Sequence, residues 1–290
     1  MMKTRFNATL AVALGALATV VVASVGWAAT DPSPVIPLVV NGNLTLTDSA
    51  PAPANIPGLK TIYSGWLFRD PDTQAMQTDD FSNPGMTGVD AGQAEWATVD
   101  GTEGKSCASC HNGIESMKGL RASMPKVTKD GKLWSLEDFI NGCRTNRMGA
   151  KAWGWKSTEM KNMTAAISLQ SRGMPVNVKT DGAAGPFWEE GKKMYYSRYG
   201  MLQLSCANCH EDHYGDHIRG DHLSQGQSNG FPVYRLSTGG LVSLQDRLFG
   251  CIRDTRAESF KPGSPELHAL ELYVASRGNG LSVEGVGVRP

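Results

Sequence analysis

Two short cysteine motifs constrain this chain more than any other feature of its sequence. They are Cys107-Ala-Ser-Cys110-His111 and Cys206-Ala-Asn-Cys209-His210. Residues three apart in a helix share a face, so both sulfurs of a motif can bond one porphyrin edge while the adjacent imidazole turns onto the iron. A zinc site would need further ligands at short spacing, and a redox dithiol would not need the histidine. The motifs therefore predict two covalently bound haem c groups, with His111 and His210 as iron ligands.

The first residues have the pattern of a secretory signal peptide. Lys3 and Arg5 precede an unbroken run of apolar and small residues over about 10–25, and a small-residue cleavage site follows near Ala28 or Ala29. The alternative is that this apolar run is retained as a membrane anchor. No later stretch of the chain is long enough to span a membrane. We therefore expect a periplasmic protein that has no membrane anchor after signal cleavage.

The balanced charge argues against a nucleic-acid-binding protein, and the position of the cysteines argues against a fold held by three disulfides. Acidic and basic side chains number 28 each, which gives no general attraction to nucleic acid or to an anionic membrane surface. We expect no nucleic-acid partner. Six cysteines in an exported chain permit three disulfides, but four of the six belong to the haem motifs.

After the first haem motif the chain runs twice through the same order of elements. The segment from Ser135 to Cys143 aligns without a gap on the segment from Ser243 to Cys251. Each begins with a Ser-x-x-Asp capping signal, which predicts a helix that starts at the serine and carries its cysteine on the apolar stripe, pointing inward. A further helix follows each segment. We predict these helices over 157–170 and 264–275, from a serine before the first turn and a glycine after the last.

This repeat predicts a mainly α fold with two cytochrome c-like domains and an extended N-terminal arm. The proline-rich composition of residues 31–58 favours the arm. The predicted divisions are a signal peptide at 1–29, the N-terminal arm and extension at 30–95, a first domain at 96–182 and a second domain, with the active site, at 183–290.

The repeated cysteines Cys143 and Cys251 are the candidates for the second axial position of each iron. A methionine is the usual partner of histidine in such proteins, but the repeat places a cysteine at the matching point of each domain. The glycine before each cysteine would let the backbone approach a flat macrocycle. Two alternatives stay open: small buried core cysteines, and a disulfide that joins the two. Thiolate ligation would make both irons harder to reduce than irons with histidine and methionine ligands.

The two sites differ one helical turn before the cysteine. Phe139 stands there in the first domain and Arg247 in the second, so we expect a cation beside the second sulfur only. A fixed guanidinium lowers the pKa of a thiol and binds oxyanions. The alternative is a surface ion pair of Arg247 with Asp246 or Asp254.

The remaining histidines lie mostly in one loop. His213, His217 and His222 follow His210 at spacings that could hold a metal, and His268 lies further on. Glycines interrupt this loop, so we favour surface histidines over a metal cluster.

At this point the chain resembles the SoxA family, the A subunits of the Sox thiosulfate-oxidising system. The resemblance covers most of the mature chain. It is carried by Met76-Gln-Thr-Asp-Asp80, Asn83-Pro84, the first haem motif, Ser171-Arg-Gly-Met-Pro175, Phe231-Pro-Val-Tyr-Arg-Leu236, Arg247-Leu-Phe-Gly-Cys251 and Gly287-Val-Arg-Pro290.

The resemblance implies an L-cysteine S-thiosulfotransferase whose active site is at the second haem. Cys251 would be its iron ligand, modified to a persulfide, and Arg247 and Arg277 would receive thiosulfate. Thiosulfate would be joined to a cysteine of the carrier protein SoxYZ. Two electrons would pass through haem to the SoxX cytochrome subunit of a heterodimer, and on to a downstream cytochrome c acceptor. Some members lack the first haem, but this chain keeps all its expected ligands.

Two other functions compete with this interpretation. In a pure electron carrier both thiolates would be inert iron ligands, and the second haem face would be closed to solvent. A dihaem peroxidase also has two such domains, but it needs an iron with an open position for peroxide, and the cysteine repeat fills both.

Overall fold

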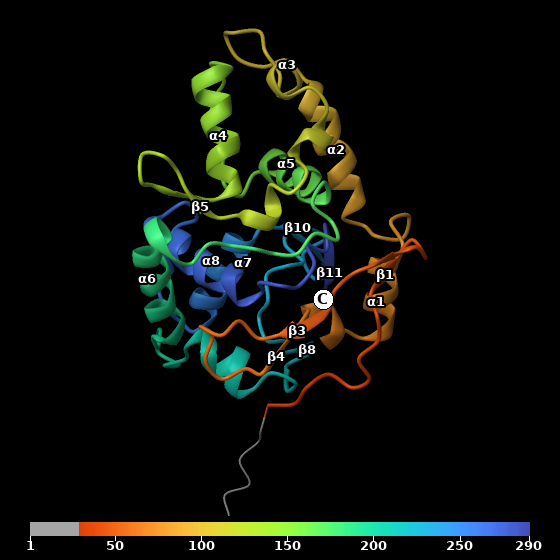
Figure 1. The fold of residues 1–290 in the computed structure, drawn as a ribbon, viewed down its shortest axis with the longest axis vertical. Helices are drawn as coiled ribbons and strands as arrows, with labels where there is room; N and C mark the ends of the chain where they lie inside the picture. Colours follow the sequence, from red (N-terminus) through yellow and green to blue (C-terminus); the bar gives the residue numbers. More distant parts are fainter. Residues whose placement is uncertain (1–28) are drawn as a thin grey trace, which may run out of the picture.

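The computed structural model describes residues 29–290 (Figure 1). The apolar run of the predicted signal peptide lies outside these residues. Among the helices that the structure describes, none is both long and apolar enough to cross a membrane.

The first helical unit forms the upper part of Figure 1. It consists of α2 (Met86–Ala97), α3 (Ala108–His111), α4 (Leu136–Arg147) and α5 (Thr158–Leu169), with the short turns η2 (Ile114–Met117) and η3 (Arg121–Ser123). Helix α2 packs against α5, and a Cβ atom on Gly92 would overlap the backbone carbonyl of Asn162. Only glycine permits this close crossing.

The second helical unit repeats this arrangement. It consists of η4 (Gly182–Ala184), α6 (Gly185–Tyr196), the π-helical turn η5 (Asn208–Asp212), α7 (Leu244–Asp254) and α8 (Pro265–Arg277). Helix α6 packs against α8, and a Cβ atom on Gly191 would overlap the carbonyl of Ala269. The two units therefore share a helix crossing held by a glycine, with a haem motif after the first helix of each pair.

The predicted helix starts are confirmed. Ser135 is the N-cap of α4, where its backbone N–H donates to Asp138 Oδ2 at 2.9 Å. Ser243 caps α7 by accepting from the backbone N–H of Asp246 at 3.2 Å. Ser157 and Ser264 cap α5 and α8 in the same way. Helix α8 runs two residues beyond the predicted end, to Arg277, before Gly278.

The structure moves one predicted boundary. The first domain was expected to start at residue 96, but this position cuts α2 close to its end. Because α2 packs against α5, we propose that the first domain starts near Met86. The predicted boundary near residue 183 falls in η4, directly before α6.

The N-terminal segment is packed against the second unit and is not an extended arm. It contains β1 (Val39–Val40), β2 (Leu44–Thr45), β3 (Ser49–Pro51), β4 (Thr61–Tyr63), η1 (Gly65–Phe68) and α1 (Pro71–Thr78). Its own apolar cluster, which includes Leu38, Trp66 and Phe68, takes in Tyr214 of the second unit. Arg69 then bridges to Asp221 at 2.6 Å. The proline-rich composition suggested an arm because it does not reveal these long-range contacts.

Small sheets complete the fold. β10 (Gly240–Val242), β9 (Val233–Arg235) and β11 (Gly287–Arg289) form one sheet, in which β9 lies antiparallel to β10 and parallel to β11. Two hairpins are formed by β5 (Lys126–Val127) with β6 (Leu133–Trp134), and by β7 (His217–Ile218) with β8 (Asp221–His222). In the three-stranded sheet, β11 brings the last residues of the chain next to β9, near the centre of the molecule in Figure 1.

A buried polar network joins the two units. Glu271 of α8 accepts hydrogen bonds from the Ser135 hydroxyl at 2.5 Å and from Gln245 Nε2 at 2.7 Å. His268 of α8 lies 2.6 Å from Asp138 of α4. The N-terminal turn of α4 is therefore attached to two helices of the second unit.

We predict that Gly191→Ala destabilises the protein. Alanine normally favours a helix over glycine by about 1 kcal/mol, but here the added methyl group meets the Ala269 carbonyl. Overpacking of this kind costs about 1–3 kcal/mol. The free energy of unfolding, measured by urea denaturation, should fall. Gly240→Ala is the control, because its Cβ atom would meet no atom within 4 Å. A Gly191→Ala protein more stable than the wild type would contradict the close crossing.

Candidate functional site

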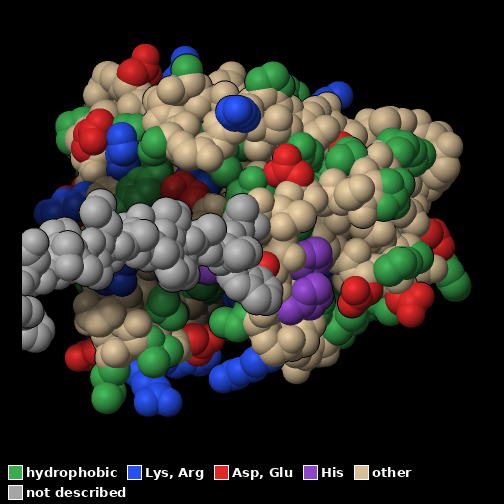
Figure 2. All heavy atoms as spheres, turned by 90° about the horizontal axis from the view of Figure 1, so that it is seen from below, with side chains coloured by type: hydrophobic (Ala, Val, Ile, Leu, Met, Phe, Trp, Pro, Cys, Tyr) green, Lys and Arg blue, Asp and Glu red, His purple; other side chains and the backbone are tan. Residues whose placement is uncertain are grey.

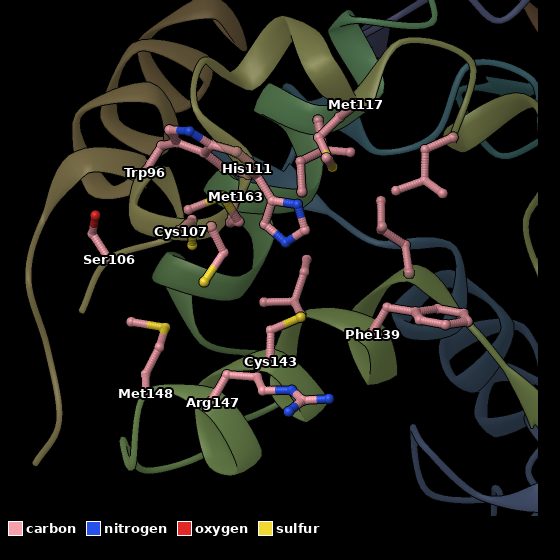
Figure 3. A pocket seen from close by; sticks show the side chains of 15 residues that line it. Trp96, Ser106, Cys107, His111, Met117, Phe139, Cys143, Arg147, Met148 and Met163 are labelled. Atoms are coloured by element: carbon pink, nitrogen blue, oxygen red, sulfur yellow. The ribbon is translucent and has the colours of Figure 1, made fainter. Parts of the chain in front are cut away.

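An apolar cavity of about 260 Å³ lies in the first unit (Figure 3). It is lined by Trp96, Ser106, Cys107, Cys110, His111, Met117, Leu120, Leu136, Phe139, Ile140, Cys143, Arg147, Met148, Met163 and Ile167. His111 reaches into it from α3 and Cys143 from α4 (Figure 3). An apolar cavity between a motif histidine and a second sulfur fits a flat macrocycle attached through Cys107 and Cys110.

The surroundings of Cys143 differ from the prediction in two ways. The side chain is exposed at the edge of the cavity and does not point into a closed core. Arg147, one helical turn later, also lines the cavity. Burial and the charge of Cys110 raise the pKa of the Cys143 thiol, and the charge of Arg147 opposes them. The expectation of a cation beside the second sulfur only is therefore wrong, because the first site has a cation on the other side of its cysteine.

The glycines before the two cysteines have different surroundings. A Cβ atom on Gly250 would meet nothing within 4 Å, which fits open space for a macrocycle. A Cβ atom on Gly142 would lie 3.3 Å from the ring of Trp134. Gly142 therefore makes room for Trp134. The two domains share this glycine, but the physical reason for it differs between them.

The disulfide alternative is excluded in this structure. All six cysteines lie within the described residues, and none is bridged. Neither Cys143 nor Cys251 is fully buried, so neither behaves as a small core side chain. Both remain available as ligands.

His210 is held in the state that an iron ligand requires. Its Nδ1 donates to the carbonyl oxygen of Ser224 at 2.7 Å, because a carbonyl can only accept. This leaves Nε2 with its lone pair free. Burial, reinforced by the charges of Arg247 and Arg277, lowers the pKa of His210 to about 4. The imidazole is therefore neutral at neutral pH.

The ring of His210 also packs closely against backbone. A Cβ atom on Gly226 would lie 2.8 Å from His210 Cγ, and Gly226 has a φ of +74°. Glycine is the residue that adopts this conformation without strain. Because Gly226 has no side chain, its backbone can lie directly against the imidazole ring of His210, which restricts the orientation of the ring.

Buried donors near His210 lack protein partners. Arg277 Nε and Nη2 and Gln227 Nε2 are buried without a hydrogen bond among the described residues. Gln227 follows Gly226 directly, and the charge of Arg277 acts on both Cys206 and His210. Unsatisfied buried donors are costly, and the carboxylates of a haem would satisfy them. The residues present therefore fit haem c at the second site.

Arg277 is placed differently from its predicted role. Its side chain is fully buried, forms an ion pair with Glu211 and lies over the ring of Tyr195 at 4.4 Å. A guanidinium with no exposed surface cannot meet a substrate that arrives from solvent. Its assignment as a catalytic residue is corrected: Arg277 anchors Glu211, the residue after His210, the predicted iron ligand.

Arg247 keeps its predicted surroundings. Asp246 pairs with Lys161 at 3.0 Å and Asp254 with Arg253 at 2.8 Å, and within residues 29–290 neither carboxylate pairs with Arg247. The charge of Cys251 is the largest cause of a raised pKa of Arg247. The surface ion pair proposed as the alternative is therefore absent, and Arg247 is a cation coupled to the Cys251 sulfur.

Sequence reasoning missed a second cation at this site. Arg235 ends β9, and burial followed by the charge of Arg247 lowers the pKa of Arg235, with Cys251 among the opposing charges. Its Nε donates to the carbonyl oxygen of Pro290 at 2.9 Å. The residue stood inside a motif of the family resemblance, but only the fold places this strand near α7.

The histidine loop does not form a metal cluster. His213 contacts Asp216 at 3.1 Å, and the rings of His217 and His222 stack at 4.5 Å. Among residues 29–290 no group of three or more His, Cys, Asp or Glu side chains is placed to hold a metal ion. Histidine side chains gather at the surface seen from below in Figure 2. His268, in contrast, is buried against Asp138.

Comparison with known proteins decides the family. A family model described as the SoxA/TsdA cytochrome c domain matches residues 91–176 and 190–283. The chain belongs to this family. The two matched segments overlap the two helical units, which supports two cytochrome c-like domains. A domain of this kind carries haem c.

Curated members of the SoxA family are close relatives. The L-cysteine S-thiosulfotransferase subunit SoxA of Paracoccus pantotrophus is 60% identical over 245 residues, which cover 84% of this chain and 84% of the relative. The subunit of the same name from Rhodovulum sulfidophilum is 53% identical and covers 90% of this chain and 92% of the relative. The crystal structure of SoxXA from P. pantotrophus matches with a TM-score of 0.87 and 56% identity, over 90% of this chain and 100% of that chain.

The buried pair of Arg277 and Glu211 leads to a prediction about stability. Arg277→Gln should lower the free energy of unfolding by about 3–5 kcal/mol, because it leaves the Glu211 carboxylate buried without its cation. The double variant Arg277→Gln with Glu211→Gln should recover part of this loss. Chemical denaturation of the four proteins in a double-mutant cycle measures the coupling. Additive losses would mean that the ion pair is not what holds Arg277.

Proposed function

We propose that this chain is the haem-bearing subunit of an L-cysteine S-thiosulfotransferase and that its active site is the distal face of the second haem. The observation that carries this proposal is the position of Arg247, a half-buried cation one helical turn before Cys251 on α7 that has no ion-pair partner among the described residues, whereas Arg147, the cation near Cys143, is exposed. The names of the close relatives support the same activity.

The reaction joins thiosulfate to a cysteine of the carrier protein SoxYZ. A bond forms between the carrier's cysteine sulfur and the terminal sulfur of thiosulfate. One proton leaves the thiol, two electrons leave the sulfur pair, and the product is a cysteine S-thiosulfonate. The sulfur atoms are oxidised, and bound haem c would be the electron acceptor.

Arg247 and Cys251 contact different parts of thiosulfate. The guanidinium of Arg247 binds the sulfonate oxygens, for which its planar donors are suited. This binding directs the terminal sulfur toward Cys251, whose sulfur, as thiolate or persulfide, exchanges with other sulfur atoms. The charge of Arg235, whose Nη2 lies 4.0 Å from Asp221 Oδ2, also interacts with this sulfur.

We propose two covalently bound haem c groups. Cys107 and Cys110 would hold the first and Cys206 and Cys209 the second, and the iron ligands would be His111 with Cys143 and His210 with Cys251. When bound, haem c supplies a redox-active iron that takes up the electrons of the reaction. The apolar cavity beside His111 and the partnerless buried donors near His210 support this assignment.

The partners follow from the reaction and the comparisons. The matched SoxXA structure supports a heterodimer with a SoxX cytochrome subunit, which receives the electrons. We propose that SoxX passes them to a downstream cytochrome c acceptor, and that SoxYZ presents the cysteine. The predicted signal peptide supports work in the periplasm, where haem c is attached and disulfides are permitted.

The alternatives are less well supported. A pure electron carrier does not need a half-buried arginine without an ion-pair partner one helical turn before its second cysteine. A dihaem peroxidase needs one open iron position, whereas a cysteine faces each motif's site. We therefore favour the transferase.

We predict that Cys251→Ser lowers thiosulfate-dependent and carrier-dependent reduction of cytochrome c by at least about 100-fold, because the reactive sulfur is lost. Both haems should stay attached, since the attachment motif is intact. Cys143→Ser should change the spectrum of the first haem and leave most turnover. Steady-state rates with SoxX and SoxYZ, and intact mass for the haem count, measure both effects. Equal losses in the two variants would refute the assignment of the chemistry to the second haem.

We predict that Arg247→Phe raises the KM for thiosulfate by about tenfold or more, since a charge-assisted hydrogen bond contributes roughly 1.5–3 kcal/mol. The helix should remain folded, because Phe139 occupies the equivalent position of α4. Arg147→Gln, at the first site, is the matched control and should leave the KM unchanged. A similar rise in both variants would mean that general charge, and not the second site, governs thiosulfate binding.

A further inference from the structure

The segment that supports His210 is attached to three separate parts of the chain. This proximal segment comprises residues 224–231. Its Ser224 carbonyl accepts from His210 Nδ1, and its Gly226 lies against the imidazole ring. Gln225, which is fully buried, accepts from the backbone N–H of Tyr63 at 2.9 Å. On the other side Asn229 donates to Glu284 at 3.0 Å.

The third attachment comes from the first helical unit. Arg121 of η3 is 7% exposed. Its Nη2 donates to the carbonyl oxygen of Ser228 at 3.1 Å, and its Nε donates to that of Phe231 at 3.3 Å. Two bonds from one planar group to two carbonyls of the same segment fix both the position and the orientation of that segment.

The position of Arg121 itself is set from the first unit. Its backbone N–H donates to the Ser171 hydroxyl at 3.2 Å. Glu137 of α4 and Glu271 of α8 line a small cavity with it, of about 20 Å³. Of these two, Glu271 compensates the buried charge of Arg121 more, because burial and the charge of Glu271 raise the pKa of Glu137 to about 8. Arg121 is therefore a rigid connection from the first haem domain to the proximal segment.

We propose that Arg121 is a positioning residue for His210, and that the first domain thereby sets the geometry of the proximal ligand at the second haem. This inference rests on the haem site proposed at His210. Partners beyond the ligands of a metal orient those ligands and tune the metal. A movement of the Ser228 carbonyl passes along four residues to the Ser224 carbonyl that holds the imidazole. The first domain thus contributes to the second site without any electron passing between the haems.

The test compares two buried arginines of the first unit. Arg144 is the matched control, since it is equally buried and donates to Asp100 and to the Lys151 carbonyl, both inside the first unit. We would prepare Arg121→Gln, Arg121→Lys and Arg144→Gln in the complete heterodimer with SoxX. Intact mass counts the haems, and electron paramagnetic resonance with a redox titration reads each iron. The signal that Cys251→Ser changes identifies the second haem.

We expect Arg121→Gln to shift the low-spin signal and the midpoint potential of the second haem, and to lower turnover by roughly threefold to tenfold. Arg121→Lys, which keeps the charge and one donor, should produce a smaller shift in the same signal. Arg144→Gln should shift the first haem's signal alone. If Arg121→Gln does not fold, the lysine variant decides by the same signals.

Two results would overturn the proposal, and they are distinguishable. If both Arg121 variants leave the second haem's signal and potential as in the wild type, Arg121 does not position His210, while the proposed function stands. If the wild type carries no haem at Cys206 and Cys209, the proposed function fails together with this inference.

Discussion

The hydrogen bond from His210 to the Ser224 carbonyl is the interaction on which the second site depends. It fixes the tautomer, so that Nε2 keeps its lone pair, while burial keeps the imidazole neutral. The carbonyl is itself held in place, because the N-terminal segment, the first unit and the last residues of the chain all bind residues 224–231. Three parts of the chain that are far apart in the sequence therefore hold the segment that positions His210.

The repeat gives the two domains the same scaffold but different electrostatics. In each, a glycine lets two helices cross closely and a serine starts the helix that carries the distal cysteine. In the first domain the cation stands after the cysteine and the proximal histidine packs on Trp96. In the second the cation stands before the cysteine, and a backbone carbonyl holds the histidine. This difference supports the proposal that two similar cofactor sites share one scaffold and that only the second serves substrate chemistry.

Local signals predicted the parts of the fold that local physics determines. The serine caps of four helices and the pairing of the two halves were readable, because a capping serine acts within three residues. The two Cys-x-x-Cys-His motifs are equally local signals, and the family model supports the cytochrome c domains that they predicted. Arg277 was misassigned because the end of a helix is usually exposed, whereas here it is enclosed by Glu211 and Tyr195. Arg235, Arg121 and the proximal segment were missed because their partners are backbone carbonyls or strands that only the tertiary fold brings together. The N-terminal segment looked extended because composition does not record its contacts with the second unit.

The central claim is that the second site joins thiosulfate to a carrier cysteine and takes two electrons in doing so. The direct measurement is a single turnover of the oxidised heterodimer with thiosulfate and SoxYZ. Carrier adducts are counted by intact mass, and electrons by the absorbance of reduced haem and acceptor cytochrome c. We expect one thiosulfonate adduct on the carrier for every two electrons, and neither product when the carrier is omitted. Reduction of haem without an adduct would contradict the claim and identify the chain as an electron carrier.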